Sequence, residues 1–258
     1  MKNSKYKILV LSDMKDTTTN TIKNGVSLAK MVGGEMHFFH VKKPTDVVDQ
    51  ESQLSAIRTI NRSYLETGNK IQNLIEPMSK DFSIAISYSH AFGNVKSEIT
   101  DYIKTNKPDI IVIGKRKSKP FNFIGDNITE FVIKNHDGAI MIASAENALE
   151  PNRELSLGVL NRTTTSFSTE FSNSVLSHSQ KPLKSFNLKQ KNSDVVNTNK
   201  DIIELVFDNG ENSIKSLSNY LTKSDVNLLC VNRSDRTKTD IKNVVSNVNV
   251  SLLISEDN

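Results

Sequence analysis

The chain has 258 residues, of which 36% are hydrophobic and 24% are charged, and its formal net charge is +4. This length suits one large or two ordinary domains of a folded protein. The excess of basic residues is too mild for a dedicated nucleic-acid-binding protein, which concentrates lysine and arginine in a stripe. We therefore expect no nucleic-acid partner.

Cysteine content and the N-terminal sequence indicate where the protein works. The lone cysteine, Cys230, excludes a disulfide bond within the chain and is typical of a reducing compartment. We interpret Cys230 as a core residue because residues 228–231 form an apolar strand. The first apolar run ends at Asp13 and is too short for a signal peptide or a membrane span. We expect a cytoplasmic protein without a membrane partner.

Strand-like and helix-like apolar spacings alternate through the first half of the chain. The strands are predicted at residues 8–12, 36–41, 82–88, 110–113 and 139–143. The helices are predicted around residues 22–31, 57–75, 95–103 and 128–134. Strands that alternate with helices pair in parallel through right-handed crossovers. The first half therefore predicts an α/β fold with a parallel five-stranded sheet flanked by helices.

The stretch 109–129, DIIVIGKRKSKPFNFIGDNIT, has the form of an anion-binding loop. A buried strand ends at Gly114, a basic loop containing Lys115 and Lys117 follows, and Gly125 precedes the next helix. Such a loop aims backbone N–H groups and the positive end of a helix dipole at an anion, usually a phosphate. The lysines of this loop could neutralise phosphate charges.

These residues resemble the universal stress proteins, whose nucleotide loop reads glycine, two residues, glycine, nine residues, glycine, then serine or threonine. Gly114 fits the first glycine and Gly125 the last. Lys117 replaces the second glycine, Asp126 replaces the hydroxyl residue, and the loop is two residues short. The resemblance implies a Rossmann-like fold, akin to that of the adenine nucleotide alpha hydrolases, and a site for ATP or another adenine nucleotide.

The candidate nucleotide site combines this loop with two strand ends. Asp13 follows the first strand, where open α/β sheets place their ligands. The resemblance places an aspartate there beside the adenine and ribose, although Asp13 could instead cap the turn into the next helix. The full candidate set is Asp13, Val41, Gly114, Lys117, Gly125, Asp126 and Asn127.

Asp126 affects both the binding of a phosphate by this loop and the chemistry that the site could support. Its carboxylate would cap a helix start but repel a phosphate. Magnesium bridging Asp13 and Asp126 to a nucleotide would turn that repulsion into coordination, so we expect magnesium only together with nucleotide. No catalytic triad or metal-ligand spacing is recognisable, and His37 and His40 point to opposite faces of one strand. We expect a non-catalytic protein, or at most a slow ATPase.

The second half repeats the first in weakened form. Residues 101–115 align without a gap with residues 219–233, and this pairs Tyr102 with Tyr220 and Asp109 with Asn227. Residues 155–161 and 184–189 stand for the first two strands. We predict two tandem domains, residues 1–146 with the remnant nucleotide loop and residues 154–258. The resemblance implies that they pack as a pseudo-dimer through their last strands, and a further homodimer stays open.

The second copy has lost the residues that would bind a ligand. We interpret Asn161 as the counterpart of Asp13 and Asn232 as that of Gly114, and residues 189–201 as a polar loop. Side chains at these positions obstruct close backbone approach to a phosphate. Two hypotheses stay open. The protein binds an adenine nucleotide through its first repeat in the stress response, or it is a ligand-free interaction protein that acts through protein partners.

Overall fold

The computed structural model describes residues 5–44, 53–115, 128–161, 169–189, 202–208, 212–233 and 241–256. Of the candidate site residues, Lys117, Gly125, Asp126 and Asn127 lie outside these ranges, as does most of the predicted loop 189–201. The strands are β1 (Tyr6–Leu11), β2 (Gly34–Lys42), β3 (Ile86–Phe92), β4 (Ile110–Gly114), β5 (Ala139–Ala143), β6 (Leu157–Leu160), β7 (Leu183–Lys189), β8 (Ile202–Asp208), β9 (Leu228–Asn232) and β10 (Ser251–Ser255). The helices are α1 (Thr18–Val32), α2 (Gln53–Phe82), α3 (Val95–Asn106), α4 (Ile128–Asn135), α5 (Glu170–Ser177), α6 (Ser213–Lys223) and α7 (Ile241–Asn247).

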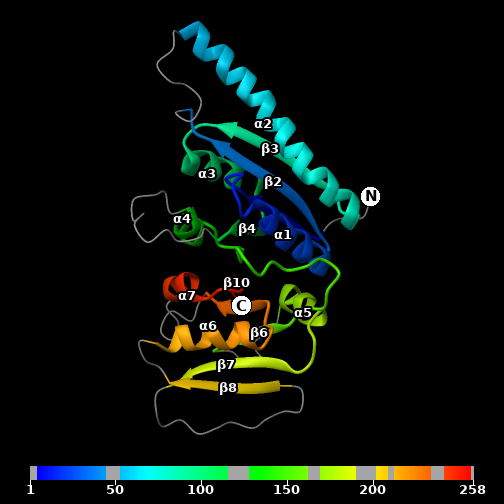
Figure 1. Cartoon of the computed structure of the whole chain (residues 1–258), viewed down its shortest axis with the longest axis vertical. Coiled ribbons are helices and arrows are strands. Elements are labelled where there is room, and N and C mark those ends of the chain that lie inside the picture. Colours follow the sequence, from blue (N-terminus) through cyan, green and yellow to red (C-terminus); the bar gives the residue numbers. More distant parts are fainter. Residues whose placement is uncertain are drawn as a thin grey trace.

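All the described strands join one sheet in the order β3-β2-β1-β4-β5-β10-β9-β6-β7-β8 (Figure 1). The order 3-2-1-4-5 of the first half recurs as 8-7-6-9-10 in the second, and neighbours within each half are parallel. The predicted fold is confirmed: two tandem Rossmann-like units, each a parallel five-stranded sheet flanked by helices, form a pseudo-dimer.

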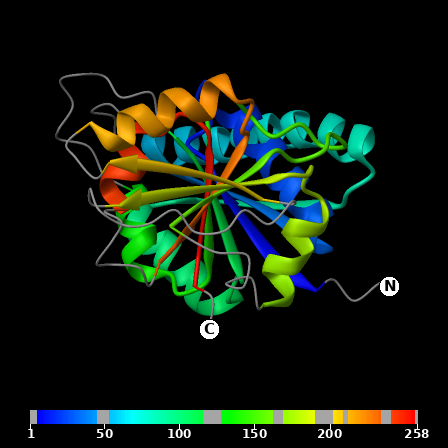
Figure 2. The same cartoon turned by 90° about the horizontal axis from the view of Figure 1, so that it is seen from below.

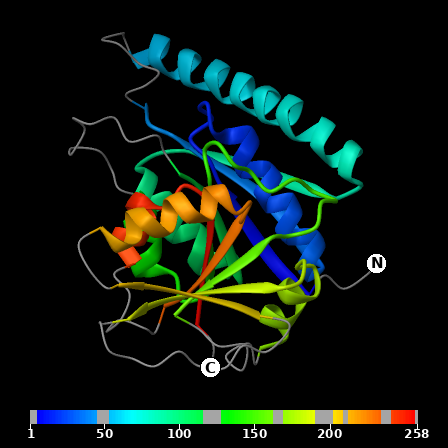
Figure 3. The ribbon, with the colours of Figure 1, turned by 60° about the horizontal axis from the view of Figure 1, so that its bottom comes forward.

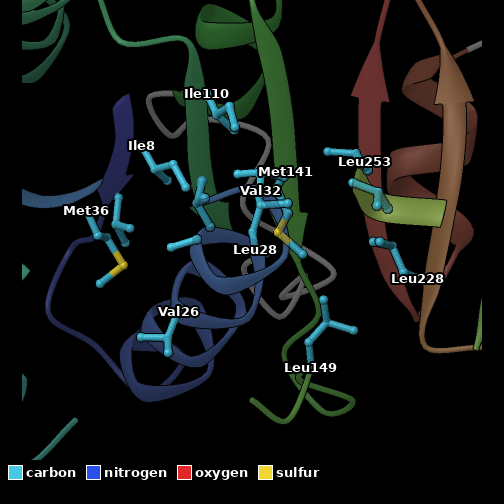
Figure 4. Packing of buried hydrophobic residues seen from close by; sticks show 14 of the residues in the cluster. Ile8, Val26, Leu28, Val32, Met36, Ile110, Met141, Leu149, Leu228 and Leu253 are labelled. Carbon is cyan, nitrogen blue, oxygen red and sulfur yellow. The ribbon is translucent and has the colours of Figure 1, made fainter. Parts of the chain in front are cut away.

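The two halves meet at the antiparallel pair β5–β10. Met141 pairs with Leu253, its counterpart in the second repeat. The residue after Met141 pairs with the residue before Leu253, and the residue before Met141 pairs with the residue after Leu253. Figure 4 shows Met141 and Leu253 on facing strands in the core. An antiparallel pair at the centre reverses the strand direction, so the carboxyl ends of the two half-sheets lie at opposite edges of the molecule.

Helices cover both faces of the twisted sheet (Figure 2). One core cluster unites β-sheet residues with apolar side chains of α1, α2 and α5, and the other unites them with side chains of α3, α4, α6 and α7. Equivalent helices of the two repeats therefore cover the same face. The long helix α2 runs along the outside of the first half (Figure 3).

Matching hydrogen bonds confirm the alignment of the two copies. The side chain of Asp109 accepts a hydrogen bond from the backbone N–H of Lys7 at 2.8 Å. The side chain of Asn227 accepts one from the backbone N–H of Ser156 at 3.0 Å. Asp109 precedes β4 and Asn227 precedes β9. Each side chain binds the backbone at the start of the neighbouring strand, β1 or β6, and this fixes the same register in both repeats.

The connection between the halves is packed rather than loose. Leu149 is buried, and its N–H approaches the side-chain oxygen of Asn24 of α1 at 3.4 Å. The same oxygen accepts a hydrogen bond from Ser251 of β10 at 2.8 Å. Asn24 is fully buried, so its amide must be satisfied within the protein. This small network holds α1, the connection and β10 together.

The structure differs from the sequence expectations in both halves of the chain. The predicted strand 82–88 begins too early, because α2 continues to Phe82 and β3 starts at Ile86. Phe82 has a helical role: the ammonium group of Lys30 of α1 lies 5.5 Å from the centre of its ring. Ser83, with a φ of 52°, turns the chain out of the helix. In the second half, the strand β8 and the helix α5 occupy segments to which the sequence assigned no element.

Candidate functional site

The candidate site lies at the carboxyl edge of the first half-sheet. Strand β1 stands between β2 and β4, and the helices that follow β1 and β4 cover opposite faces. The strand order reverses at this point, where open α/β sheets form a ligand crevice. Val41 of β2 and Gly114 of β4 lie at this edge, and Asp13 follows the end of β1 between them.

Asp13 lies in a tight turn between β1 and α1. Its carboxylate accepts a hydrogen bond from the backbone N–H of Lys15 at 3.2 Å, which stabilises the turn that leads into α1. The hydroxyl of Ser12 accepts a bond from the N–H of Met14 at 3.1 Å and lies 2.9 Å from the hydroxyl of Thr18. Met14 has a φ of 59° in the left-handed region. These bonds fix the backbone of the turn that contains Asp13.

His40 supports the same turn from β2. Its Nδ1–H donates to the carbonyl oxygen of Ser12 at 2.8 Å, and the residue is buried. Burial lowers the pKa of His40, whereas the carboxylate of Asp13 acts to raise it. His37 points to the other face, where its ring stacks on Tyr102 with 5.2 Å between ring centres. The prediction that the two histidines cannot share a metal ion is confirmed.

Gly114 ends β4 directly under α1. A Cβ atom at this position would collide with the hydroxyl of Thr21 and would lie 3.1 Å from that of Thr17. Because the hydroxyl of Thr21 already donates to the carbonyl oxygen of Thr17 at 2.9 Å, it is not free to swing away without cost. The glycine is therefore required by helix packing.

Lys115, the next residue, points away from the candidate crevice. Its ammonium group donates to the carbonyl oxygen of Val248 at 2.6 Å and lies 3.4 Å from that of Ser246. Both carbonyls lie at the carboxyl end of α7 in the second repeat, where a positive charge is favourable. Burial lowers the pKa of Lys115. The interpretation of Lys115 as a phosphate-neutralising residue is wrong, because its charge serves the contact between repeats.

Arg233 makes the reciprocal contact at the opposite edge of the sheet. It follows β9 as Lys115 follows β4, and its Nη1 donates to the carbonyl oxygen of His136 at 2.7 Å, beyond the end of α4. Arg233 is 9% exposed, and burial lowers the pKa of its guanidinium while Glu256 and Asp137 act to raise it. We name the contacts of Lys115 and Arg233 the cross-repeat clamps. Sequence reasoning missed them because each joins segments more than ninety residues apart.

The register corrects one assignment in the second repeat. The backbone N–H of Asn161 donates to the carbonyl oxygen of Phe186 at 2.7 Å, just as that of Ser12 donates to Phe39. Asn161 is therefore the counterpart of Ser12 and not, as expected, of Asp13. The error arises because sequence patterns place a strand end only to within a residue or two.

At the carboxyl edge of the second repeat, a side chain binds the backbone of the neighbouring strand. The side-chain oxygen of Asn161 accepts a hydrogen bond from the backbone N–H of Leu188, the counterpart of Val41, at 2.8 Å. Asn232 pairs with Ser255 of β10 as Gly114 pairs with Ala143 of β5, which confirms Asn232 as the counterpart of Gly114.

Two features are absent from the described residues. No helix among them is both long and apolar enough to cross a membrane. They also contain no group of three or more histidine, cysteine, aspartate or glutamate residues placed to hold a metal ion.

Comparisons with known proteins agree with this architecture. The model of the universal stress protein family matches residues 6–143, more than half of the chain. A universal stress protein from Archaeoglobus fulgidus DSM 4304 is 12% identical with a TM-score of 0.66, and the alignment covers 98% of this chain and 96% of that one. A putative universal stress protein from Pseudomonas aeruginosa UCBPP-PA14 is 8% identical with a TM-score of 0.56, covering 97% and 93%. No curated protein matches significantly. These structures share the fold, and the family match shows that the chain belongs to the universal stress protein family.

Proposed function

We propose that the first repeat binds an adenine nucleotide, with ATP as the first candidate, and that the protein serves the stress response without catalysing a reaction. The observation that supports this proposal is that Asp13, Val41 and Gly114 lie at or just beyond the carboxyl ends of three adjacent strands at the switch point. The remaining residues, Lys117, Gly125, Asp126 and Asn127, are proposed from the sequence of the loop that follows Gly114.

Each of these three positions can contribute a different part of nucleotide recognition. The Asp13 carboxylate can accept hydrogen bonds from ribose hydroxyls. Val41 is half-buried on the outer part of β2 and offers an apolar contact for a base. Gly114 lets a phosphate approach the backbone, and the loop beyond it would supply N–H groups. Magnesium bound with the nucleotide would offset the negative charge of Asp126 and of the phosphates.

A ligand-free interaction protein is the second candidate, and one observation favours it. Gly114 and Lys115, the two described residues of the loop sequence, both have packing roles that need no ligand. A chain selected only for its fold and its surface would keep both. We propose for either case that the repeats extend over residues 1–146 and 154–258 and that the protein acts in the cytoplasm.

Calorimetric titration of the full chain with ATP, with and without magnesium, tests the proposal. At about 0.15 M salt, loose attraction between lysine and phosphate is partly screened. We expect saturable binding of about one nucleotide per chain with a Kd below about 0.1 mM. The absence of saturable heat would overturn the proposal and leave the ligand-free candidate.

Two neighbouring lysines provide a matched pair of variants. Lys117→Met should weaken ATP binding several-fold, because an exposed contact with phosphate contributes about 1 kcal/mol. Lys115→Met should leave the affinity nearly unchanged, because its ammonium group is already bound to α7. Asp126→Ser should strengthen binding in the absence of magnesium by removing like-charge repulsion. Equal effects of the two lysine variants would contradict the assignment.

A further inference from the structure

Two histidines face each other under the long helix α2. The register of β2 and β3 pairs His40 directly with His90, so both side chains lie on the same face of the sheet. This is the face on which α2 packs, since the core cluster there includes Ile71 and Ile75 of that helix. We call His40 and His90 the histidine pair.

The histidine pair connects α2 to the turn of the candidate site. The Nε2–H of His90 donates to the carbonyl oxygen of Tyr64 in α2 at 3.0 Å, and the two rings are in contact, tilted by 36° with 4.0 Å between their centres. On the other side, the Nδ1–H of His40 donates to the carbonyl oxygen of Ser12. Each neutral ring has one N–H, and each uses it to bind a backbone carbonyl.

Helix α2 passes close to the pair, and its nearest described side chains are uncharged. A Cβ atom at Gly68 would lie 3.3 Å from Cε1 of His90. Ser63 and Thr67 are buried on this side of the helix, 7% and 6% exposed. The ammonium group of Lys42 donates to the hydroxyl of Ser63 at 2.8 Å, which brings a fixed positive charge to the same junction.

The charges around the pair oppose the uptake of two protons. Burial is the largest cause that lowers the pKa of His40, and the charges of His90 and Lys42 lower it further. Among the charged groups of the described residues that act on His40, Asp13 alone favours its protonation. Burial also lowers the pKa of His90, against its bond to Tyr64. A proton on both rings would place three positive charges beneath an uncharged face of α2.

We propose that the histidine pair is a proton-sensitive latch that holds α2 on the sheet near neutral pH and releases it in acid. Near neutral pH, both rings are uncharged and their single N–H groups are satisfied. In acid, the second ring nitrogens also become donors, and His40⁺, His90⁺ and Lys42 repel one another. Lifting α2 exposes the pair to water and relieves this repulsion. The latch does not depend on nucleotide binding.

Amide hydrogen exchange of the full chain at about pH 7 and about pH 5.5 tests the latch, with protection factors corrected for the intrinsic effect of pH. The test variant combines His40→Asn with His90→Gln. Asparagine keeps an N–H near the position of Nδ1 and glutamine keeps one near Nε2, so both bonds to carbonyls are retained without a titrating ring. His178→Asn is the matched control, because His178 is exposed at the end of α5.

In the unaltered protein and in the control, acid should lower the protection of α2 by about tenfold more than that of α1. The double variant should lose this difference. Equal changes in α1 and α2, or an unchanged loss in the double variant, would overturn the proposal. NMR titration of the unaltered protein gives a second measurement: both histidines should titrate below 6.5, in two coupled steps. Independent titration of the two rings would also overturn it.

Discussion

The two repeats share a strand order and differ at their carboxyl edges. In the first repeat, Gly114 ends β4 under the hydroxyls of Thr21 and Thr17, and Asp13 lies in the turn after β1. In the second, Asn232 takes the place of Gly114, and the side chain of Asn161 occupies the neighbouring backbone N–H of Leu188. The core that specifies the fold has been kept, whereas the edge residues that could bind a ligand are present in one copy alone.

The cross-repeat clamps show what the second copy provides instead. Lys115 and Arg233 occupy equivalent positions and each donates to a carbonyl oxygen beyond a helix of the other repeat. Together with the β5–β10 pair, they fix the two copies at two opposite edges of the sheet. The second repeat therefore stabilises the first along β5, which lies at the opposite side of the first half-sheet from β3.

The largest expected loss of stability follows from removing Arg233, the more buried of the two residues that form the cross-repeat clamps. Arg233→Ala should lower the free energy of unfolding by about 2–3 kcal/mol, because it leaves the carbonyl oxygen of the buried His136 without its charged donor. Lys115→Ala should cost only about 1 kcal/mol, since its bonds to carbonyls lie at a half-buried site. Urea unfolding of both variants measures the difference, and equal losses would refute unequal clamps.

Gly114→Ala tests the packing at the end of β4. The added methyl group meets the hydroxyl of Thr21, so we expect a loss of about 1–3 kcal/mol in the free energy of unfolding. Thr21→Ala in the same chain should recover part of this loss, because it removes the atom that collides. In the second repeat, Asn232→Ala should cost about 1 kcal/mol or less. A Gly114→Ala protein as stable as the unaltered chain would contradict the described contact.

Acid should act on the first repeat before the second. Burial lowers the pKa of His37, His40, His90 and His136, all in the first repeat, whereas His178 of the second is exposed. The unfolded chain then binds protons more readily than the folded one, so stability is full above about pH 6.5 and falls as the pH drops below that value. Urea midpoints measured across this range should fall with pH. A midpoint independent of pH would exclude the buried neutral histidines.

The smallest effect concerns the ion pairs between α4 and α7. Hydrogen bonds from Lys242 and Lys134 hold the pKa of Glu130 at about 2, below its usual 4.5. This contribution to stability is present above pH 4.5 and is lost as the pH falls towards about 2. Lys242→Met should raise the pKa of Glu130, which carbon NMR of the carboxyl group measures. An unchanged pKa would show that Lys242 contributes nothing across the repeats.

The fold could be predicted because its signals are local and repeated. Buried parallel strands such as 110–113 appear in the sequence as unbroken β-branched runs. The alignment of Asp109 with Asn227 predicted the second repeat. The start of β3 was missed because Phe82 looks like a strand residue, while its contacts with α1 make it the end of α2. Apolarity alone does not distinguish a helix end from a strand start.

The candidate site was predictable only in part, for a different reason. Asp13, Val41 and Gly114 could be found because strand ends of a parallel sheet gather at one edge. The role of Lys115 could not be found, because its partners belong to the other repeat and no spacing within the loop indicates them. Asn161 was misplaced because its role follows from pairing with Phe186 rather than from its neighbours in sequence.

NMR mapping of ATP binding tests the difference between the repeats most directly. Backbone amide signals of the full chain are followed during titration with magnesium and ATP at about 0.15 M salt. We expect saturable shifts at Asp13, Val41 and Gly114, with the signals of Asn161, Leu188 and Asn232 unchanged. Shifts of similar size at both edges, or at the second edge alone, would contradict the account of one binding repeat and one scaffold.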